Sequence, residues 1–236
     1  MSAEQRRNED ARREMFAAIR GHLAASAPHD AVRAAHHAAT AHGEDVSARD
    51  EKSVVVAFEG TAVERFRQAL EAVAGRCFIV KDEAEAAEVL RQIVEQRNSQ
   101  RVAVSDSPLA GRVVGLAALA AEVLEDAAVG NLFDCDLGVT GAQWGVAETG
   151  TLVLESDAER HRLASLVPSA HVALVEAGRV RQTLGEVLRA VNERGEASLS
   201  RAITFITGPS RTSDIELTLA IGVHGPAELY VVVIGG

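Results

Sequence analysis

Leu229-Tyr230-Val231-Val232-Val233-Ile234, close to the C-terminus, is a continuous run of apolar and mostly β-branched residues. Such a run is typical of a strand that is buried on both faces, as in parallel sheets covered by helices. Only 3% of the residues are aromatic although 47% are hydrophobic, so the core must consist mainly of Val, Leu, Ile and Ala. Both observations favour an α/β fold.

The segments that precede this run alternate between helical and extended patterns. Helices are predicted over 62–74, 82–97, 116–124 and 184–192, and strands over 77–80, 101–104, 152–155, 172–175 and 202–206. Asp82 is expected to be the N-cap of its helix, with Glu85 three residues later as in a capping box. Strands that alternate with helices of this length indicate an α/β sheet with substantial parallel pairing.

The composition changes near residue 50. The first 50 residues contain only three Val or Ile, at positions 19, 32 and 46, whereas the last 36 contain nine. Apolar residues recur at helical spacing over 9–26, which predicts an amphipathic helix. We therefore expect a helical extension and linker over 1–52, followed by an α/β domain over 53–236.

Charge and cysteine content exclude several classes of protein. The net charge is −10, from 34 acidic and 24 basic residues, which disfavours nucleic-acid binding. Cys77 and Cys135 are the only cysteines, so the chain cannot supply four thiolates to an iron–sulfur cluster, and no metal site is expected. With no apolar run of about 18 residues and no apolar N-terminal segment, we expect a soluble, cytoplasmic protein without a membrane span.

A glycine-rich segment over 138–151, Gly-Val-Thr-Gly-Ala-Gln-Trp-Gly-Val-Ala-Glu-Thr-Gly-Thr, is the first candidate for a site. Glycines let the backbone turn tightly and approach a ligand closely, and Glu148 is placed to act as a base or nucleophile. The alternative is structural: the glycines serve turns and packing, while Glu148 caps a helix or pairs with an arginine. The spacing matches neither of the two common nucleotide-binding fingerprints.

A second candidate is the loop Thr-Gly-Pro-Ser-Arg-Thr-Ser-Asp-Ile-Glu over 207–216, which directly follows a predicted strand. Ligands of open α/β sheets bind outside the carboxyl ends of the strands, where we expect this loop to lie. The planar fork of Arg211 suits a carboxylate or phosphate. Alternatively, Ser213 or Asp214 is an N-cap and Arg211 is solvated.

A third candidate is His224, which lies between glycines before the last strand and is either an acid–base group or a turn residue.

These three motifs, in this order, resemble those of the LUD-domain (lactate-utilisation) family, in particular its LutC-like branch, over about residues 60–236. The resemblance implies a Rossmann-like α/β sheet similar to that of the sugar-isomerase and CoA-transferase group. It also implies a part in oxidation of L-lactate to pyruvate together with iron–sulfur partner proteins. The chain itself would then bind no cofactor, and the clusters would lie on its partners. Trp144 departs from the pattern, since a smaller residue is expected there, and its indole would narrow a pocket.

Matching the motifs by position gives a set of candidate residues. Glu148 and His224 are the candidate catalytic residues. The candidate residues for binding a small carboxylate ligand are Gly141, Thr149, Gly150, Thr151, Ser210, Arg211, Thr212 and Asp214.

Three functions stay open at this point. The chain is an accessory subunit of a lactate-oxidising complex, or a stand-alone enzyme of CoA-transferase or sugar-phosphate-isomerase type that uses Glu148. A binding module without chemistry would share the same pocket residues.

Overall fold

The computed structural model describes Ala17 and residues 60–125, 129–156, 162–194, 200–213, 219–221 and 225–236. The chain divides into two compact units, Met1–Phe58 and Glu59–Gly236, and the elements below belong to the second. The predicted extension over 1–52 and its boundary lie outside the described residues, apart from Ala17, which is helical.

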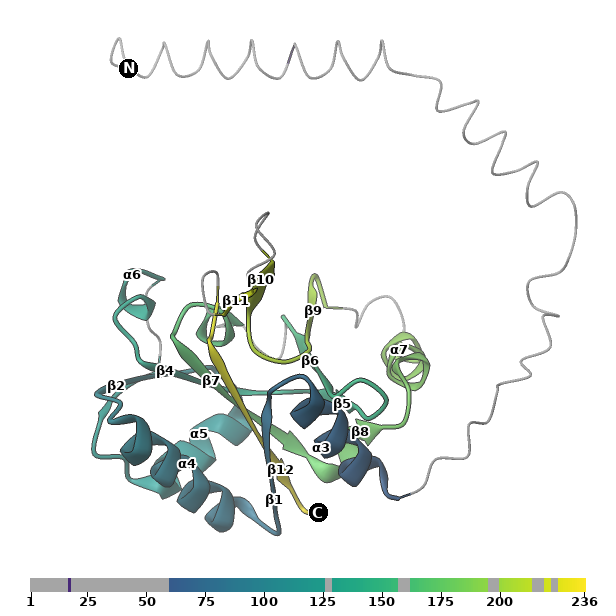
Figure 1. Ribbon diagram of the computed structural model, residues 1–236, viewed down its shortest axis with the longest axis horizontal. Coiled ribbons are helices and arrows are strands. Elements are labelled where there is room, and N and C mark those ends of the chain that lie inside the picture. The colour runs from purple at the N-terminus through teal and green to yellow at the C-terminus, as the bar shows by residue number, and fades with distance from the viewer. Residues whose placement is uncertain are drawn as a thin grey trace, which may run out of the picture. The chain divides into compact units, whose positions relative to one another are not determined.

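A six-stranded sheet with the order β1-β12-β7-β4-β2-β3 forms the centre of this unit (Figure 1). Its strands are β1 (Arg76–Val80), β2 (Arg101–Val104), β3 (Glu122–Leu124), β4 (Leu137–Gly141), β7 (Ala170–Glu176) and β12 (Glu228–Ile234). All neighbouring pairs are parallel. The predicted α/β fold with parallel pairing is therefore confirmed.

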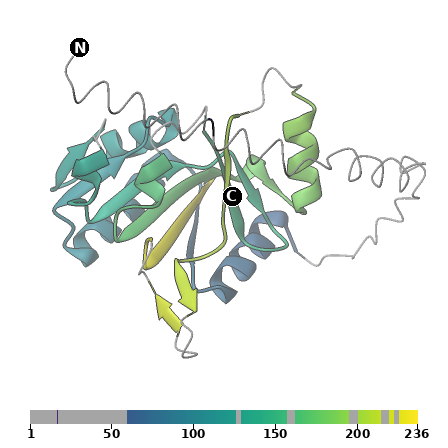
Figure 2. The same ribbon diagram turned by 90° about the horizontal axis from the view of Figure 1, so that it is seen from above.

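The apolar run near the C-terminus is buried on both faces of this sheet, as predicted. On one face, Tyr230, Val232 and Ile234 of β12 share a core with helices α4 (Glu83–Arg97) and α5 (Pro108–Ala117). On the other face, Leu229, Val231 and Val233 share a core with helix α3 (Ala62–Ala72). Figure 2 shows α4 and α5 side by side along the sheet. Helices on both faces explain why the run has no charged position.

A second, four-stranded sheet has the order β8-β5-β6-β9. It contains β5 (Trp144–Val146), β6 (Thr151–Glu155), β8 (Val180–Arg181) and β9 (Ile203–Ile206). β6 pairs antiparallel with both β5 and β9. Helix α7 (Leu184–Asn192) covers one face, and Leu152 and Leu154 on the other face join the core under α3.

Shorter elements complete the described part of the chain. They are α6 (Val129–Leu132), η2 (Arg162–Ser165), η3 (Ala177–Arg179), β10 (Arg211–Ser213) and β11 (Leu219–Ile221), of which β10 and β11 pair antiparallel.

The helix predicted over 116–124 is wrong. Helix α5 occupies Pro108–Ala117 instead, and residues Glu122–Leu124 form β3. Ser107 caps α5 by accepting a hydrogen bond from the backbone of Ala110, and proline is well suited to the first helical turn. The helix ends because Ala118 takes the left-handed conformation, with φ 46°. The missed start was visible in the sequence as Ser107-Pro108.

The helix caps agree with the predictions only in part. Asp82 accepts a hydrogen bond from the backbone of Glu85, so it is the predicted N-cap of α4. The Glu85 carboxylate, however, accepts from the backbone of Lys81 rather than Asp82, so the box is not reciprocal. A complete capping box is found at α3, between Thr61 and Glu64.

Candidate functional site

The parallel sheet has a topological switch point between β2 and β4. From β2 the chain passes through α5 to β3 at the sheet edge, whereas β4 leads through the second sheet to β7 on the opposite side. The connections after two neighbouring strands therefore diverge, and this leaves room between them. Crevices at such points, outside the carboxyl ends of the strands, are the usual ligand sites of open α/β sheets.

A cleft of about 370 Å³ lies at this switch point. We call it the switch-point cleft. Its lining residues come from the segments after β2, β4 and β7, and from the ends of β6 and α7: Ser107, Pro108, Leu109, Arg112, Gly141, Ala142, Gln143, Trp144, Glu155, Glu176, Arg179 and Arg194. Three arginines face two glutamates in this set, and the first turn of α5 adds the positive end of a helix dipole. The guanidinium groups and this helix end are the groups of the cleft that can bind an anion.

Glu155 at the end of β6 forms the base of a buried polar network. Glu155 is 1% exposed, and its carboxylate accepts hydrogen bonds from Trp144 Nε1 at 3.2 Å and from Ser200 Oγ at 3.3 Å. Arg194 Nη2 lies 2.5 Å from Glu155 Oε2. The Glu155 amide donates to Gln143 Oε1 at 2.6 Å. These contacts satisfy the buried carboxylate and hold the Trp144 indole in one orientation.

Two arginines lie against the Trp144 ring, Arg179 at 5.0 Å and Arg181 at 5.1 Å from the ring centroid. Arg181 Nη1 donates to the Gly178 carbonyl oxygen at 2.7 Å. Arg179 makes no hydrogen bond with any residue that the structure describes, and its nearest carboxylate oxygen, on Glu176, is 3.9 Å away. Only Arg179 of the two lines the switch-point cleft. It therefore offers a guanidinium that stacks on Trp144 and makes no hydrogen bond with the described residues, so that its donors can bind a ligand.

Arg112 contributes a second positive charge to this cleft from the middle of α5. Its guanidinium makes a bidentate ion pair with Glu83 at the start of α4, with Nη2 2.8 Å from Oε1. This pairing raises the pKa of Arg112 and lowers the pKa of Glu83. Part of the Arg112 guanidinium is thus occupied by Glu83, which leaves Arg179 as the main candidate for ligand binding.

The sequence-predicted residues mostly lie elsewhere. Of them, Gly141 lines the switch-point cleft and Ser210 lines a second pocket, while Glu148, Thr149, Gly150 and Thr151 line neither. Glu148 is exposed and its Oε1 accepts a hydrogen bond of 2.7 Å from the backbone of Leu184, at the start of α7. This is the capping role that was the structural alternative for Glu148.

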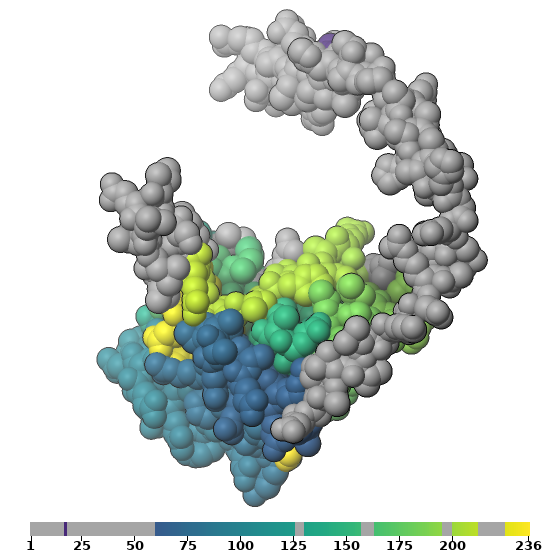
Figure 3. Space-filling view, turned by 45° about the vertical axis from the view of Figure 1, so that its right-hand side comes forward, coloured from purple at the N-terminus to yellow at the C-terminus, as the bar shows by residue number. Residues whose placement is uncertain are grey.

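The Glu-Thr-Gly-Thr motif packs against α3. The hydroxyl of Thr151 is 2.7 Å from those of Thr149 and Thr207, which ties the turn after β5 to the end of β9. Gly150 has φ +64°, and a Cβ there would be 2.3 Å from the backbone nitrogen of Leu70. Figure 3 shows α3 in blue beside the teal-green turn and the yellow-green segment that follows β9. The motif therefore fixes α3 on the second sheet.

The loop over 207–216 was expected at the carboxyl ends of the sheet strands, and this expectation is wrong. β9 belongs to the second sheet and runs antiparallel to β6, so the segment after it reaches the amino ends of the parallel strands. There Ser210 donates its backbone N–H to the carbonyl of Pro226, two residues before β12. Arg211 is exposed and its Nη2 donates to the Val73 carbonyl oxygen at 2.7 Å. Thr212 lies in β10, and Asp214 and His224 lie outside the described residues.

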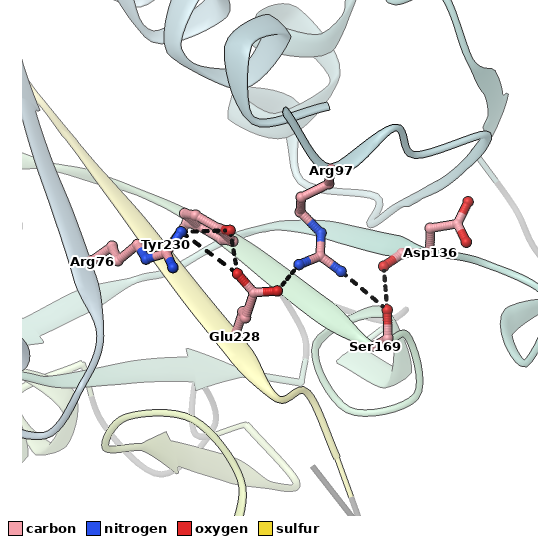
Figure 4. Close-up of polar contacts among 6 residues, drawn as sticks. All are labelled: Arg76, Arg97, Asp136, Ser169, Glu228 and Tyr230. Carbon is pink, nitrogen blue, oxygen red and sulfur yellow. Dashed lines mark hydrogen bonds and ion pairs between the residues drawn. The ribbon is translucent and has the colours of Figure 1, made fainter. Parts of the chain in front are cut away.

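A polar network joins the amino ends of the parallel strands (Figure 4). Glu228 at the start of β12 pairs with Arg97 at the end of α4 and lies 3.6 Å from Arg76 at the start of β1. The Tyr230 hydroxyl donates to Glu228 at 2.5 Å, and Arg97 Nη2 donates to Ser169 Oγ at 3.3 Å. Arg97 Nε has no hydrogen-bond partner among the described residues, but the charged groups of the network pair with one another and none of them lines either pocket, so we interpret it as structural.

His171 on β7 is a buried histidine that sequence reasoning missed. It is 1% exposed, its Nε2 lies 2.8 Å from Thr140 Oγ1, and its Nδ1 has no hydrogen-bond partner among the residues that the structure describes. Burial lowers the pKa of His171 from its usual 6.5 to about 3, so the ring is neutral. A polar residue in the otherwise apolar run 170–175 was the feature that could have identified it, as Glu155 at the end of an apolar strand was.

The pKa of His171 predicts an acid-dependent loss of stability. Between about pH 6.5 and pH 3 the unfolded chain binds a proton that the folded chain does not. Burying the neutral ring therefore costs no pH-dependent stability above pH 6.5. Below pH 6.5 the free energy of unfolding falls on acidification, by up to about 1.4 kcal/mol per pH unit. The double variant Thr140→Val/His171→Phe replaces both members of the buried hydrogen bond and removes this acid-dependent loss of stability. Urea unfolding at pH 7, 6 and 5 should show that the wild type loses more stability than the variant. Parallel losses would contradict the buried neutral histidine.

Both thiols lie in surroundings that suppress ionisation. Burial raises the pKa of Cys77 to about 12, and burial also raises the pKa of Cys135. Among the residues that the structure describes, no group of three or more His, Cys, Asp or Glu is arranged to hold a metal ion. No described helix is long and apolar enough to cross a membrane.

Fold and cleft together define an α/β protein with an arginine-lined cleft at the carboxyl ends of a parallel sheet. The model of the LUD domain family matches residues 63–234, and the chain belongs to that family. A solved structure of a DUF162 family protein from Deinococcus radiodurans has a TM-score of 0.56 and 25% identity, and the match covers 74% of this chain and 96% of that one.

Curated relatives include proteins named lactate utilization protein C. The one from Deinococcus radiodurans is 40% identical over 101 residues, which are 42% of this chain and 47% of that protein. The one from Macrococcus caseolyticus is 29% identical over 154 residues, 62% of this chain and 67% of that protein. The first curated relatives are matched over only 42–47% of their own length.

Proposed function

We propose that this chain is an accessory subunit in lactate utilisation that binds a small carboxylate, such as L-lactate or pyruvate, in the switch-point cleft. The observation that carries the proposal is the Arg179 guanidinium, which lines the cleft, stacks on Trp144 and has no hydrogen-bond partner among the described residues. The names of the relatives support lactate as the physiological context.

The cleft suits a small 2-hydroxy or 2-keto acid. Arg179 can bind the carboxylate with two parallel hydrogen bonds, and the start of α5 adds a favourable dipole. The amide group of Gln143, whose oxygen is held by the Glu155 amide, has N–H donors for the hydroxyl or keto oxygen. Glu155 and Glu176 limit the positive charge, so the cleft is matched to one carboxylate rather than to several phosphates.

The electron transfer is assigned to iron–sulfur partner proteins. Oxidation of lactate to pyruvate releases two electrons and two protons, and some group must accept the electrons. Two cysteines cannot provide four thiolates for a cluster, and both thiols have raised pKa values. In this proposal the chain binds and orients the carboxylate, and the redox centres lie on its partners.

Growth and turnover measurements test the two parts of the proposal. Deleting the gene in its source organism should abolish growth on L-lactate as the sole carbon source, and a plasmid copy should restore it. The purified chain alone should reduce no redox dye with L-lactate. Normal growth of the deletion strain would contradict the role in lactate utilisation, and lactate-dependent dye reduction by the chain alone would overturn the accessory role.

One observation favours the alternative of a stand-alone enzyme. A buried carboxylate, Glu155, lines the switch-point cleft, whereas Glu148 caps α7 outside it. A CoA-transferase- or isomerase-type reaction would therefore use Glu155 as nucleophile or base. In that case Glu155→Gln should abolish activity on an acyl-CoA or sugar phosphate while Glu148→Gln retains it. A wild-type chain that is inactive on both classes of substrate would exclude this alternative.

A further inference from the structure

Glu176 is a second carboxylate of the switch-point cleft, besides the buried Glu155. It is the last residue of β7, and the three residues that follow it form η3, which ends with Arg179. Glu176 occupies the N-cap position of η3, but its side chain makes no cap hydrogen bond. It makes no hydrogen bond with any other side chain that the structure describes. Since Glu176 lines the cleft, its carboxylate oxygens can accept hydrogen bonds from a ligand there.

The Glu176 carboxylate lies beside two guanidinium groups. Its Oε2 is 3.9 Å from Arg179 Nε, which is too far for a hydrogen bond. The pKa of Arg112 is raised mainly by its hydrogen bonds to Glu83 and additionally by the charge of Glu176, so Glu176 lies near Arg112 as well. The side chains of Arg179 and Glu176 are 52% and 59% exposed, and a ligand can therefore contact both of them.

These neighbouring groups match the two functional groups of a 2-hydroxy acid. A ligand whose carboxylate is bound by Arg179 carries its 2-oxygen on the adjacent carbon atom, and that oxygen stays near the guanidinium and its neighbour Glu176. An ionised carboxylate only accepts hydrogen bonds. The hydroxyl of a 2-hydroxy acid can donate to it, whereas the keto oxygen of a 2-keto acid has no proton to donate and is repelled.

We propose that Glu176 makes the switch-point cleft selective for a 2-hydroxy acid over the corresponding 2-keto acid, by accepting a hydrogen bond from the 2-hydroxyl group. This inference rests on the proposed function, because it requires that Arg179 holds the carboxylate of the ligand. It narrows the ligand to the reduced acid, L-lactate. Pyruvate lacks the contact with Glu176 and dissociates more readily.

The comparison of L-lactate with pyruvate isolates this contact. Both acids have three carbon atoms and one carboxylate, so the attraction of that carboxylate to Arg179 and its repulsion by Glu176 are nearly the same for the two. The ratio of their dissociation constants therefore reports on the 2-oxygen. Propionate, which has no 2-oxygen, gives the affinity that the carboxylate provides alone.

Titration calorimetry on the full chain with these three acids tests the proposal. The wild type should bind L-lactate at least about fivefold more tightly than pyruvate, and pyruvate no more tightly than propionate. In Glu176→Gln the ratio between pyruvate and L-lactate should fall below about twofold, because an amide N–H can donate to the keto oxygen while the amide oxygen still accepts from the hydroxyl.

Glu193→Gln is the matched control for the loss of one negative charge. Glu193 is exposed, precedes Arg194 in the sequence and does not line the cleft. The ratio between pyruvate and L-lactate should therefore stay within about twofold of the wild-type ratio in this variant. A ratio that falls equally in Glu193→Gln would show that charge alone, and not a contact with Glu176, determines the preference, and would overturn the inference.

The outcomes separate this inference from the proposed function. Equal wild-type affinities for L-lactate and pyruvate, or an unchanged ratio in Glu176→Gln, would overturn the role of Glu176. The carboxylate proposal would stand in that case if Arg179→Ala still weakened the binding of both acids. Absence of binding of all three acids, or binding that Arg179→Ala leaves unchanged, would overturn both proposals.

Discussion

Gly150→Ala is expected to destabilise the protein by about 3–5 kcal/mol, which would lower the melting temperature by roughly 10 °C or more. A Cβ at this position would lie 2.3 Å from Leu70 N and 2.5 Å from Leu70 Cα. Both are backbone atoms of α3, so no side-chain rotation relieves the clash. The φ of +64° adds strain for alanine. Either α3 or the turn after β5 must move.

Gly115→Ala is the matched control for this measurement. Gly115 lies within α5, is exposed, and has no atom within 4 Å of the position of an added Cβ. Alanine there should stabilise by about 0.5–1 kcal/mol. If Gly150→Ala melted like the wild type but lost carboxylate binding, the motif would be a ligand site and not a packing contact.

Arg194→Met is expected to cost about 2 kcal/mol in the free energy of unfolding, measured by urea denaturation. It leaves the Glu155 carboxylate buried, with Trp144 and Ser200 as its remaining side-chain partners. Removing one partner of a fully buried pair costs about 3–5 kcal/mol. The smaller figure applies here because the Arg194 side chain is 41% exposed, so solvent screens part of the interaction.

Two further variants separate pairing from general surface effects. Arg67→Met removes an exposed ion pair, with Glu71 at 3.6 Å, and should change stability little. Glu155→Gln/Arg194→Met removes both charges and should recover most of the loss, since an amide costs less to bury than an unpaired carboxylate. A double variant no more stable than Arg194→Met would show that Glu155 is not the source of the penalty.

The sequence was most informative where one local pattern determines an element. The apolar run before the C-terminus predicts its own burial on both faces, because every position must be apolar when helices cover both sides. The helix predicted over 116–124 failed because Ser107-Pro108, a cap followed by a first-turn proline, outweighs the later apolar residues. The second sheet could not be predicted, because pairing of β9 with β6 depends on contacts distant in sequence.

The site was harder to predict than the fold. Gly141 was among the candidates because the glycines of the segment 138–151 let the backbone approach a ligand closely. Glu155 ends β6, Arg179 ends η3 and Arg194 follows α7, so they come together only in the folded chain. Conversely, the motifs that resemble a known family contain Gly150 and Glu148, which lie against α3 and α7 and outside the switch-point cleft.

Titration calorimetry with L-lactate on Arg179→Ala and Arg181→Ala tests the switch-point cleft most directly. Both variants lose one guanidinium stacked on Trp144, but only Arg179 lines the cleft. Arg179→Ala should bind L-lactate at least tenfold more weakly than the wild type, and Arg181→Ala within about twofold of it, since a lost charge-assisted bidentate pair is worth about 1.4 kcal/mol or more. Unchanged binding in Arg179→Ala, together with loss of binding in Arg211→Ala, would instead place the site at the amino ends of the strands.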